Sequence, residues 1–185
     1  MASRALVAVF LALLCGCGQG EAASEPDPPE PAVSYTVDIP AFWQRTTERM
    51  SRLSDPRELF SATTVALSWQ RTNCEAFAGA AGEGMRADDV VLTLWERGHA
   101  SNSAWSDFPQ RPPAFGPVDD PERGTCGEPP GTMVHWRNFT DSGRHFHTLV
   151  RVGPDATHEA AAEAWRILDS LRFDPGYRPN WPASG

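Results

Sequence analysis

The chain has 185 residues, of which 41% are hydrophobic, and a formal net charge of −8 at pH 7. This length suits one domain with flanking segments. An acidic chain lacks the basic patch that nucleic acids or anionic membrane surfaces require, so we exclude both as partners.

The N-terminus has the pattern of an export signal. Arg4 is its one basic residue, and an uninterrupted apolar run from Ala5 to Leu14 follows. About 20 apolar residues are needed to span a bilayer, so this run is too short for a transmembrane helix and fits a secretory signal. The run ends in Leu14-Cys15-Gly16-Cys17, which resembles a bacterial lipobox, whose last cysteine becomes lipidated.

This resemblance implies a lipoprotein signal over residues 1–16 and a lipid on Cys17, the first residue of the mature chain. Cys15 stands where a small residue such as alanine or serine is usual. The alternative is an ordinary signal cut near Ala22-Ala23, which would give a secreted protein. We expect anchoring at the outer face of the cytoplasmic membrane through acyl chains alone, each buried CH₂ contributing about 0.8 kcal/mol.

Residues 17–31 have the composition of a tether. After Cys17 they consist mostly of Gly, Ala, Ser, Glu and Pro, with no large apolar side chain. Such a segment cannot bury enough surface to offset its ordering entropy, so we expect it to be extended and disordered. Loss of Arg4 with the signal changes the charge from −8 to −9. A single domain is then expected over residues 32–176, with a tail over 177–185.

Two cysteines, Cys74 and Cys126, remain in this domain. In an oxidising compartment they can pair in only one way, so we expect a disulfide that stabilises the fold by about 4 kcal/mol. The alternative is two free thiols, one of them a nucleophile.

The first half of the domain alternates between strand and helix patterns. Alternating apolar residues predict a strand over 33–39, and a helix follows over 40–53 with Phe42, Thr46, Met50 and Leu53 on one face. Further strands are predicted over 60–69 and 90–95, with a short helix over 74–81 between them.

The last third predicts a β-hairpin, from Thr132 to Val152, and an amphipathic helix from Ala156 to Leu171. Asp141-Ser142-Gly143 suits a three-residue loop. If residues 140 and 144 face each other, the core face carries Val134, Trp136, Phe146, Val150 and Val152, and the other, solvated face carries His135, Arg137, His145 and His147. The helix has Asp155 or Thr157 as N-cap and buries Ala161, Ala164, Trp165, Leu168 and Leu171. The fold class is α+β, a mostly antiparallel sheet of four to six strands with two or three helices packed on it.

Several short strings between Phe60 and Phe173 are similar to a recurrent domain of uncharacterised secreted or membrane-attached proteins of actinobacteria. They are Ala62-Thr63-Thr64-Val65, Cys74, Val90 to Glu96, Phe108 to Pro112, Phe115, Cys126, Gly143 to Phe146, Leu149, Gly153 to Ala156 and Ile167 to Leu171. The order of the last elements, a helix followed by a final strand, also resembles in topology lipoprotein domains of the Mog1/PsbP-like class. These resemblances imply a bacterial cell-envelope protein and carry over no catalytic residue.

Three histidines on the hairpin are the metal-ligand candidates. The expected register puts His135, His145 and His147 on one face, where three imidazole nitrogens could reach a cation. Arg137 would lie among them and repel it. We therefore expect a polar surface with no metal and no cofactor.

An aromatic and proline-rich segment covers residues 105–115. It could be an interaction surface anchored by Trp105, Phe108 and Arg111, residue types that interfaces favour. The alternative, which we favour, is a packed loop whose aromatic side chains cover the sheet edge.

No nucleophile motif accompanies the serines near His99. Ser101 and Ser103 lie close in sequence, but no Gly-x-Ser-x-Gly turn presents either of them. We therefore expect a non-catalytic binding or accessory module that recognises an envelope protein or cell-wall component. The alternative is an envelope hydrolase with His99 or a hairpin histidine as general base.

Replacement of Cys17 tests the lipid anchor. Cys17→Ser should move the protein from the detergent phase to the aqueous phase in phase partitioning, because the acyl chains are lost. An unmodified wild-type N-terminus at Ser24 would show instead that the signal is of the ordinary secretory type.

Overall fold

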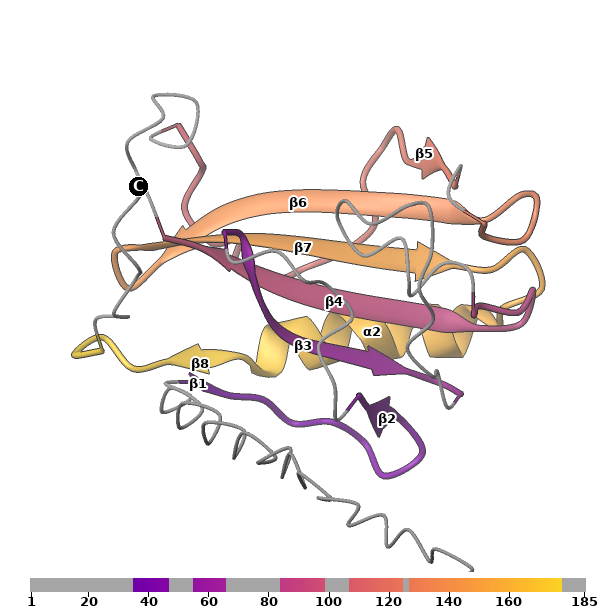
Figure 1. Ribbon diagram of the computed structural model, residues 1–185, viewed down its shortest axis with the longest axis horizontal. Helices are drawn as coiled ribbons and strands as arrows, with labels where there is room; N and C mark the ends of the chain where they lie inside the picture. The colour runs from indigo at the N-terminus through magenta and orange to yellow at the C-terminus, as the bar shows by residue number, and fades with distance from the viewer. Residues whose placement is uncertain (1–34, 47–54, 66–83, 99–106, 125–126, 178–185) are drawn as a thin grey trace, which may run out of the picture. The chain divides into compact units, whose positions relative to one another are not determined.

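A computed structural model describes residues 35–46, 55–65, 84–98, 107–124 and 127–177 (Figure 1). All of them belong to the unit formed by residues 31–185. Among these residues no helix is both long and apolar enough to cross a membrane. Residues 1–34 lie outside the described ranges, so the signal, Cys17 and the tether remain predictions.

Eight strands form two sheets, and one helix accompanies them in the described ranges. The six-stranded sheet is antiparallel throughout, in the order β2 (Gln44–Arg45), β3 (Arg57–Thr63), β4 (Val90–Arg97), β7 (Arg144–Val152), β6 (Met133–Asp141) and β5 (Glu122–Arg123). A second sheet pairs β1 (Tyr35–Thr36) with β8 (Arg172–Phe173). The α+β class with a dominant antiparallel sheet is confirmed, whereas two or three helices are not supported.

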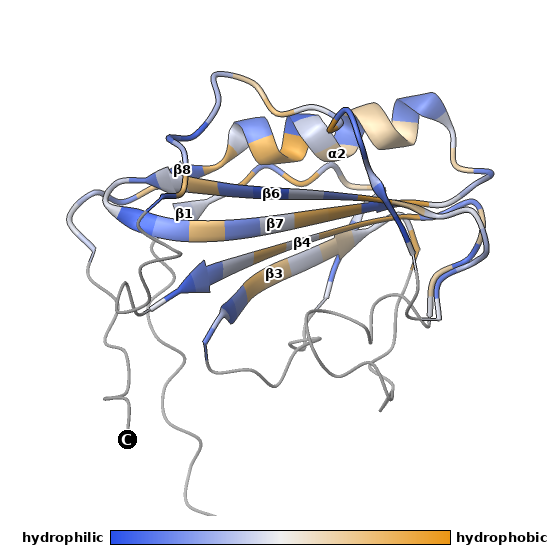
Figure 2. Cartoon of the chain, turned by 90° about the horizontal axis from the view of Figure 1, so that it is seen from above, coloured by the Kyte–Doolittle hydropathy of each residue, from blue (hydrophilic) through white to orange (hydrophobic). Residues whose placement is uncertain are grey.

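Helix α2 (His158–Ser170) lies across one face of the large sheet (Figure 2). Thr157, one of the two predicted caps, accepts a hydrogen bond from the backbone N–H of Ala160 at 3.1 Å, which satisfies a donor of the first turn. The buried positions include Trp165 and Leu168 as predicted, and also Ile167. These side chains pack with residues of the strands in one continuous core, among them Leu92, Phe146 and Val150.

The hairpin turn differs from the prediction by one residue. Asp141 pairs with Arg144, so the loop is Ser142-Gly143 alone, and both residues have positive φ, 51° and 71°. A two-residue loop with two positive φ angles matches the twist of the flanking strands better than the three-residue loop expected. Ser142 accepts this conformation while its hydroxyl donates to Asp141 Oδ1 at 2.9 Å.

This one-residue shift turns every β6 side chain to the opposite face. His135 pairs with Val150 and Trp136 with Leu149, so His135 faces α2 and Trp136 faces away. Trp136 stacks on Trp95, with ring centroids 6.2 Å apart. The faces predicted for Val134, Trp136, His135 and Arg137 are therefore wrong, whereas Phe146, Val150 and Val152 on β7 do face the helix core.

The face turned away from α2 is buried, which contradicts the prediction of a solvated surface. Trp95 and Leu149 are fully buried there, and His147 is 5% exposed. Polar groups on this face bind one another: Ser61 Oγ lies 2.7 Å from Glu58 Oε1 and 3.0 Å from Thr93 Oγ1. Such hydrogen bonds offset the cost of burying polar atoms. The polar residues of this face can therefore be buried, although a polar sequence pattern usually indicates solvent exposure.

A buried carboxylate ties three neighbouring strands together. Glu96 on β4 is fully buried and accepts hydrogen bonds from Arg57 on β3 at 2.8 Å and from Arg144 on β7 at 2.5 Å. The Arg144 guanidinium also lies over the rings of Phe146 and Phe173, at 5.1 and 5.3 Å from their centroids. A buried charge is tolerated only with such partners.

The helix predicted over 40–53 is wrong over residues 40–46. The backbone N–H of Trp43 donates to the carbonyl of Pro40 at 2.9 Å, which closes a turn, and β2 follows directly. Trp43 is buried in the core, so tertiary packing outweighs the helical spacing of the apolar residues here. The rest of that helix, and the one predicted over 74–81, lie outside the described residues.

The predicted strands agree with the structure to different degrees. β4 confirms the strand predicted over 90–95 and extends it to Arg97. β3 begins at Arg57, earlier than predicted, and ends at Thr63. Of the strand predicted over 33–39, residues 35–39 are described, and within them Tyr35 and Thr36 alone pair with another strand.

Truncation of Leu168 tests the packing of α2. Leu168 is fully buried, so Leu168→Ala should leave a cavity and lower the free energy of unfolding by about 2–5 kcal/mol in chemical denaturation. The exposed loop residue Asp120 is the control, and Asp120→Ala should change the value by no more than about 0.5 kcal/mol. Equal effects of the two substitutions would contradict the position of the helix.

Candidate functional site

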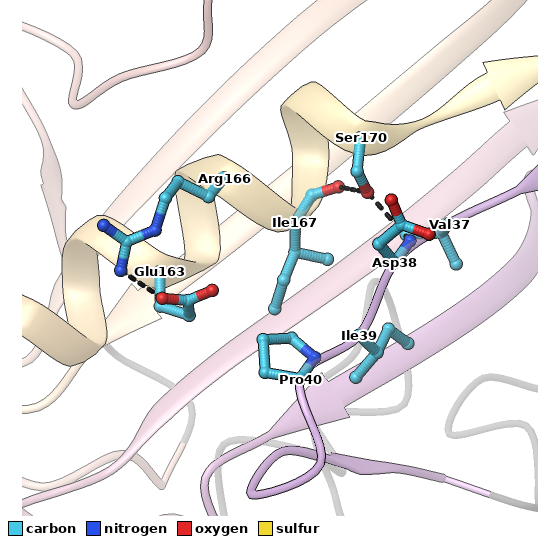
Figure 3. A pocket seen from close by; sticks show the side chains of 8 residues that line it. All are labelled: Val37, Asp38, Ile39, Pro40, Glu163, Arg166, Ile167 and Ser170. Atoms are coloured by element: carbon cyan, nitrogen blue, oxygen red, sulfur yellow. Dashed lines mark hydrogen bonds and ion pairs between the residues drawn. The ribbon is translucent and has the colours of Figure 1, made fainter.

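An open groove of about 570 Å³ lies between α2 and the segment that follows β1 (Figure 3). One wall is the extended segment Val37 to Pro40. The other wall is the outer side of α2, from Glu163 to Ser170. Its lining combines four apolar and four polar side chains: Val37, Ile39, Pro40 and Ile167, with Asp38, Glu163, Arg166 and Ser170.

Ser170 holds the two walls together. Its Oγ accepts a hydrogen bond from the backbone N–H of Asp38 at 2.9 Å and donates to the carbonyl of Ile167 at 2.7 Å. Val37 and Ile39 pack against the core at their inner sides. The groove is thus bordered by two backbone segments that are fixed to each other.

The charged groups of the groove are mostly acidic. Arg166 donates to Glu163 across one helical turn, and this hydrogen bond raises the pKa of Arg166 above its ordinary value, as does the nearby carboxylate of Glu159. Asp38 is exposed, and in the described part of the chain its carboxylate takes part in no ion pair. Two carboxylates, Asp38 and Glu163, therefore line the groove with one guanidinium, and Glu159 lies one helical turn before Glu163.

The groove chemistry suits binding better than covalent catalysis. The hydroxyl of Ser170, its one alcohol, already donates to Ile167, and no described histidine lines the groove to activate it. The apolar side chains offer contact area, and the carboxylates offer sites for cationic or hydrogen-bond-donating groups.

His147 lies on the buried face, away from this groove. Its Nε2 accepts a hydrogen bond from Arg97 Nε at 2.6 Å, so Nδ1 carries the proton and donates to Asn138 Oδ1 at 2.5 Å. Burial lowers the pKa of His147 from 6.5 to about 4, and the charge on Arg97 acts in the same direction. Near neutral pH the ring is thus an uncharged, fully engaged packing group.

The three histidines proposed as metal candidates do not come together. His135 lies on the α2 face, where its ring contacts Trp165 edge to face at 5.4 Å and its Nδ1 accepts from the backbone N–H of Val118 at 3.3 Å. His145 and His147 lie on the opposite face of the same sheet. Within the ranges that the structure describes, no three His, Cys, Asp or Glu side chains are grouped to hold a metal ion.

Of the predicted interaction residues, Arg111 and Phe108 are engaged inside the fold. The guanidinium of Arg111 donates to the carbonyls of Leu168, Asp169 and Leu171 at 2.7–3.1 Å, which caps the C-terminus of α2. Phe108 contacts His147 edge to face at 4.9 Å. These contacts favour the packed-loop interpretation for the described part of the segment.

The predicted site residues Trp105, His99, Cys74 and Cys126 also lie outside the described ranges. The interaction surface that includes Trp105, the general base His99 and the Cys74–Cys126 disulfide therefore stay predictions.

The groove residues were not identified as a site from the sequence. Val37 and Ile39 alternate as in any strand, and Glu163 and Arg166 are ordinary for the exposed side of a helix. Comparisons with protein-family models, with curated proteins and with solved structures found no match. The groove geometry is therefore the main basis for a functional proposal.

The depressed pKa of His147 predicts acid sensitivity. An unfolded chain binds the proton at about 6.5 and the folded chain only at about 4, so stability should fall as the pH drops between these values, by up to about 3 kcal/mol. Chemical denaturation from pH 7.5 to about 4 measures this slope. His147→Gln, which cannot titrate, should flatten it, and an unchanged slope would contradict the assignment.

Proposed function

We propose that the chain is a lipid-anchored, non-catalytic binding module of the bacterial cell envelope. Cys17 would carry the lipid at the outer face of the cytoplasmic membrane, and residues 17–31 would hold the domain away from the bilayer. The domain would bind an envelope protein or cell-wall component through the groove beside α2.

The groove is the observation that carries this proposal. It is open and lined by aliphatic and charged side chains on two segments that Ser170 fixes to each other. Binding surfaces gain from such pre-organisation, because little ordering entropy is lost on association. No step of bond breaking follows from these side chains.

The engaged state of His135 and His147 favours binding over the envelope hydrolase alternative. A general base must have a free nitrogen within reach of the substrate proton. The Nε2 of His147 accepts from Arg97 and its ring is 5% exposed, and His135 accepts from Val118. Both rings serve packing and internal hydrogen bonding in the described part of the fold.

Site-specific photo-crosslinking tests this proposal in the full-length chain. Ile39→p-benzoylphenylalanine places a photoreactive group in the groove, and Asp120→p-benzoylphenylalanine places it in an exposed loop that does not line the groove. We expect a discrete adduct in the membrane fraction from position 39 and none from position 120. Identical adduct patterns, or no adduct from position 39, would contradict a binding role for the groove.

A further inference from the structure

We infer that the groove receives a polypeptide segment that carries aliphatic and basic side chains. This inference rests on the proposed binding function and names its ligand class. The aliphatic requirement comes from Val37, Ile39, Pro40 and Ile167, which together line the groove. An aliphatic side chain that enters it would be removed from water on several sides, the main source of affinity for such contacts.

The basic requirement comes from charge complementarity. Asp38 and Glu163 line the groove, and Glu159 lies one helical turn before Glu163. Arg166 is the one cation among them and is paired with Glu163. The chain as a whole carries −8, so a basic segment is attracted both locally and at longer range.

Phe42 follows the groove residue Pro40 by two positions and has an exposed aromatic ring. It is 64% exposed, the highest exposure among the large hydrophobic side chains that the structure describes. The turn from Pro40 to Trp43 holds it, and the buried Trp43 anchors the turn in the core. An exposed aromatic side chain on a turn whose backbone is anchored in the core is typical of protein-binding surfaces.

These charges argue against two other occupants. A second copy of the chain would bring the same carboxylates of Asp38, Glu159 and Glu163 near one another, which is repulsive. An anionic lipid surface would be repelled in the same way. A segment with aliphatic and basic side chains complements both the apolar lining and the acidic groups of the groove.

Photoreactive peptides test the ligand class on the full-length protein in phosphatidylcholine vesicles. One hexapeptide alternates photoreactive leucine with arginine, and its partner alternates photoreactive leucine with glutamate. We expect the arginine peptide to reach half-maximal labelling at a concentration about tenfold lower. The adducts should map to residues 37–42 and 163–170, and about 0.5 M salt should reduce the difference between the peptides.

Three variants locate the effect. Asp38→Asn should weaken labelling by the arginine peptide about three- to fivefold, since one exposed ion pair is lost. Asp119→Asn removes an equally exposed carboxylate that does not line the groove and should change nothing. Ile39→Ser should weaken labelling by both peptides, because it removes apolar contact without changing charge.

The outcomes separate the inference from the proposed function. Equal labelling by the two peptides, or equal effects of Asp38→Asn and Asp119→Asn, would overturn the basic ligand class while the crosslink from position 39 still supports a binding groove. Dimers of the chain that form through the p-benzoylphenylalanine at position 39 would identify a second copy as the occupant and also overturn the inference. If position 39 also gives no adduct, both the ligand class and the proposed binding function are overturned.

Discussion

The two-residue turn at Ser142-Gly143 sets the alignment of β6 on β7, and the rest of the described fold depends on that alignment. It places Phe139 opposite Phe146, where the two rings stack at 5.2 Å on the α2 side. The same alignment brings His135 to Trp165 and carries Asn138 to His147 on the other side of the sheet. Because side chains alternate along a strand, no other alignment of β6 preserves these three contacts together.

Burial of both sheet faces explains where the polar groups lie. Glu96 takes two arginine partners on the α2 side, and His147 takes Arg97 and Asn138 on the opposite side. A buried ionisable group without a partner would destabilise the fold. The internal hydrogen bonds and ion pairs of these side chains prevent that cost. The groove proposed as the binding site lies beside α2, where the chain continues from β1.

The sequence predicted the parts of the fold whose patterns are long and local. β4 is mostly apolar from Val90 to Trp95, and α2 combines a cap with a regular buried stripe, so both were predicted within a few residues. The faces of β6 depended on one residue in the turn, and the helix predicted from Pro40 gave way to the burial of Trp43. The groove could not be predicted, because it joins Asp38 and Ser170, which lie 132 residues apart and meet only in the folded chain.

The Arg111 cap of α2 also bears on which substitutions this fold can accept. One planar guanidinium reaches the carbonyls of Leu168, Asp169 and Leu171, and also pairs with Asp141 beside the hairpin turn. The ammonium group of a lysine is a compact charge and cannot donate to all these oxygens in the same planar arrangement. Replacement of Arg111 by lysine is therefore not conservative. The junction of loop, hairpin and helix therefore depends on the shape of this one side chain.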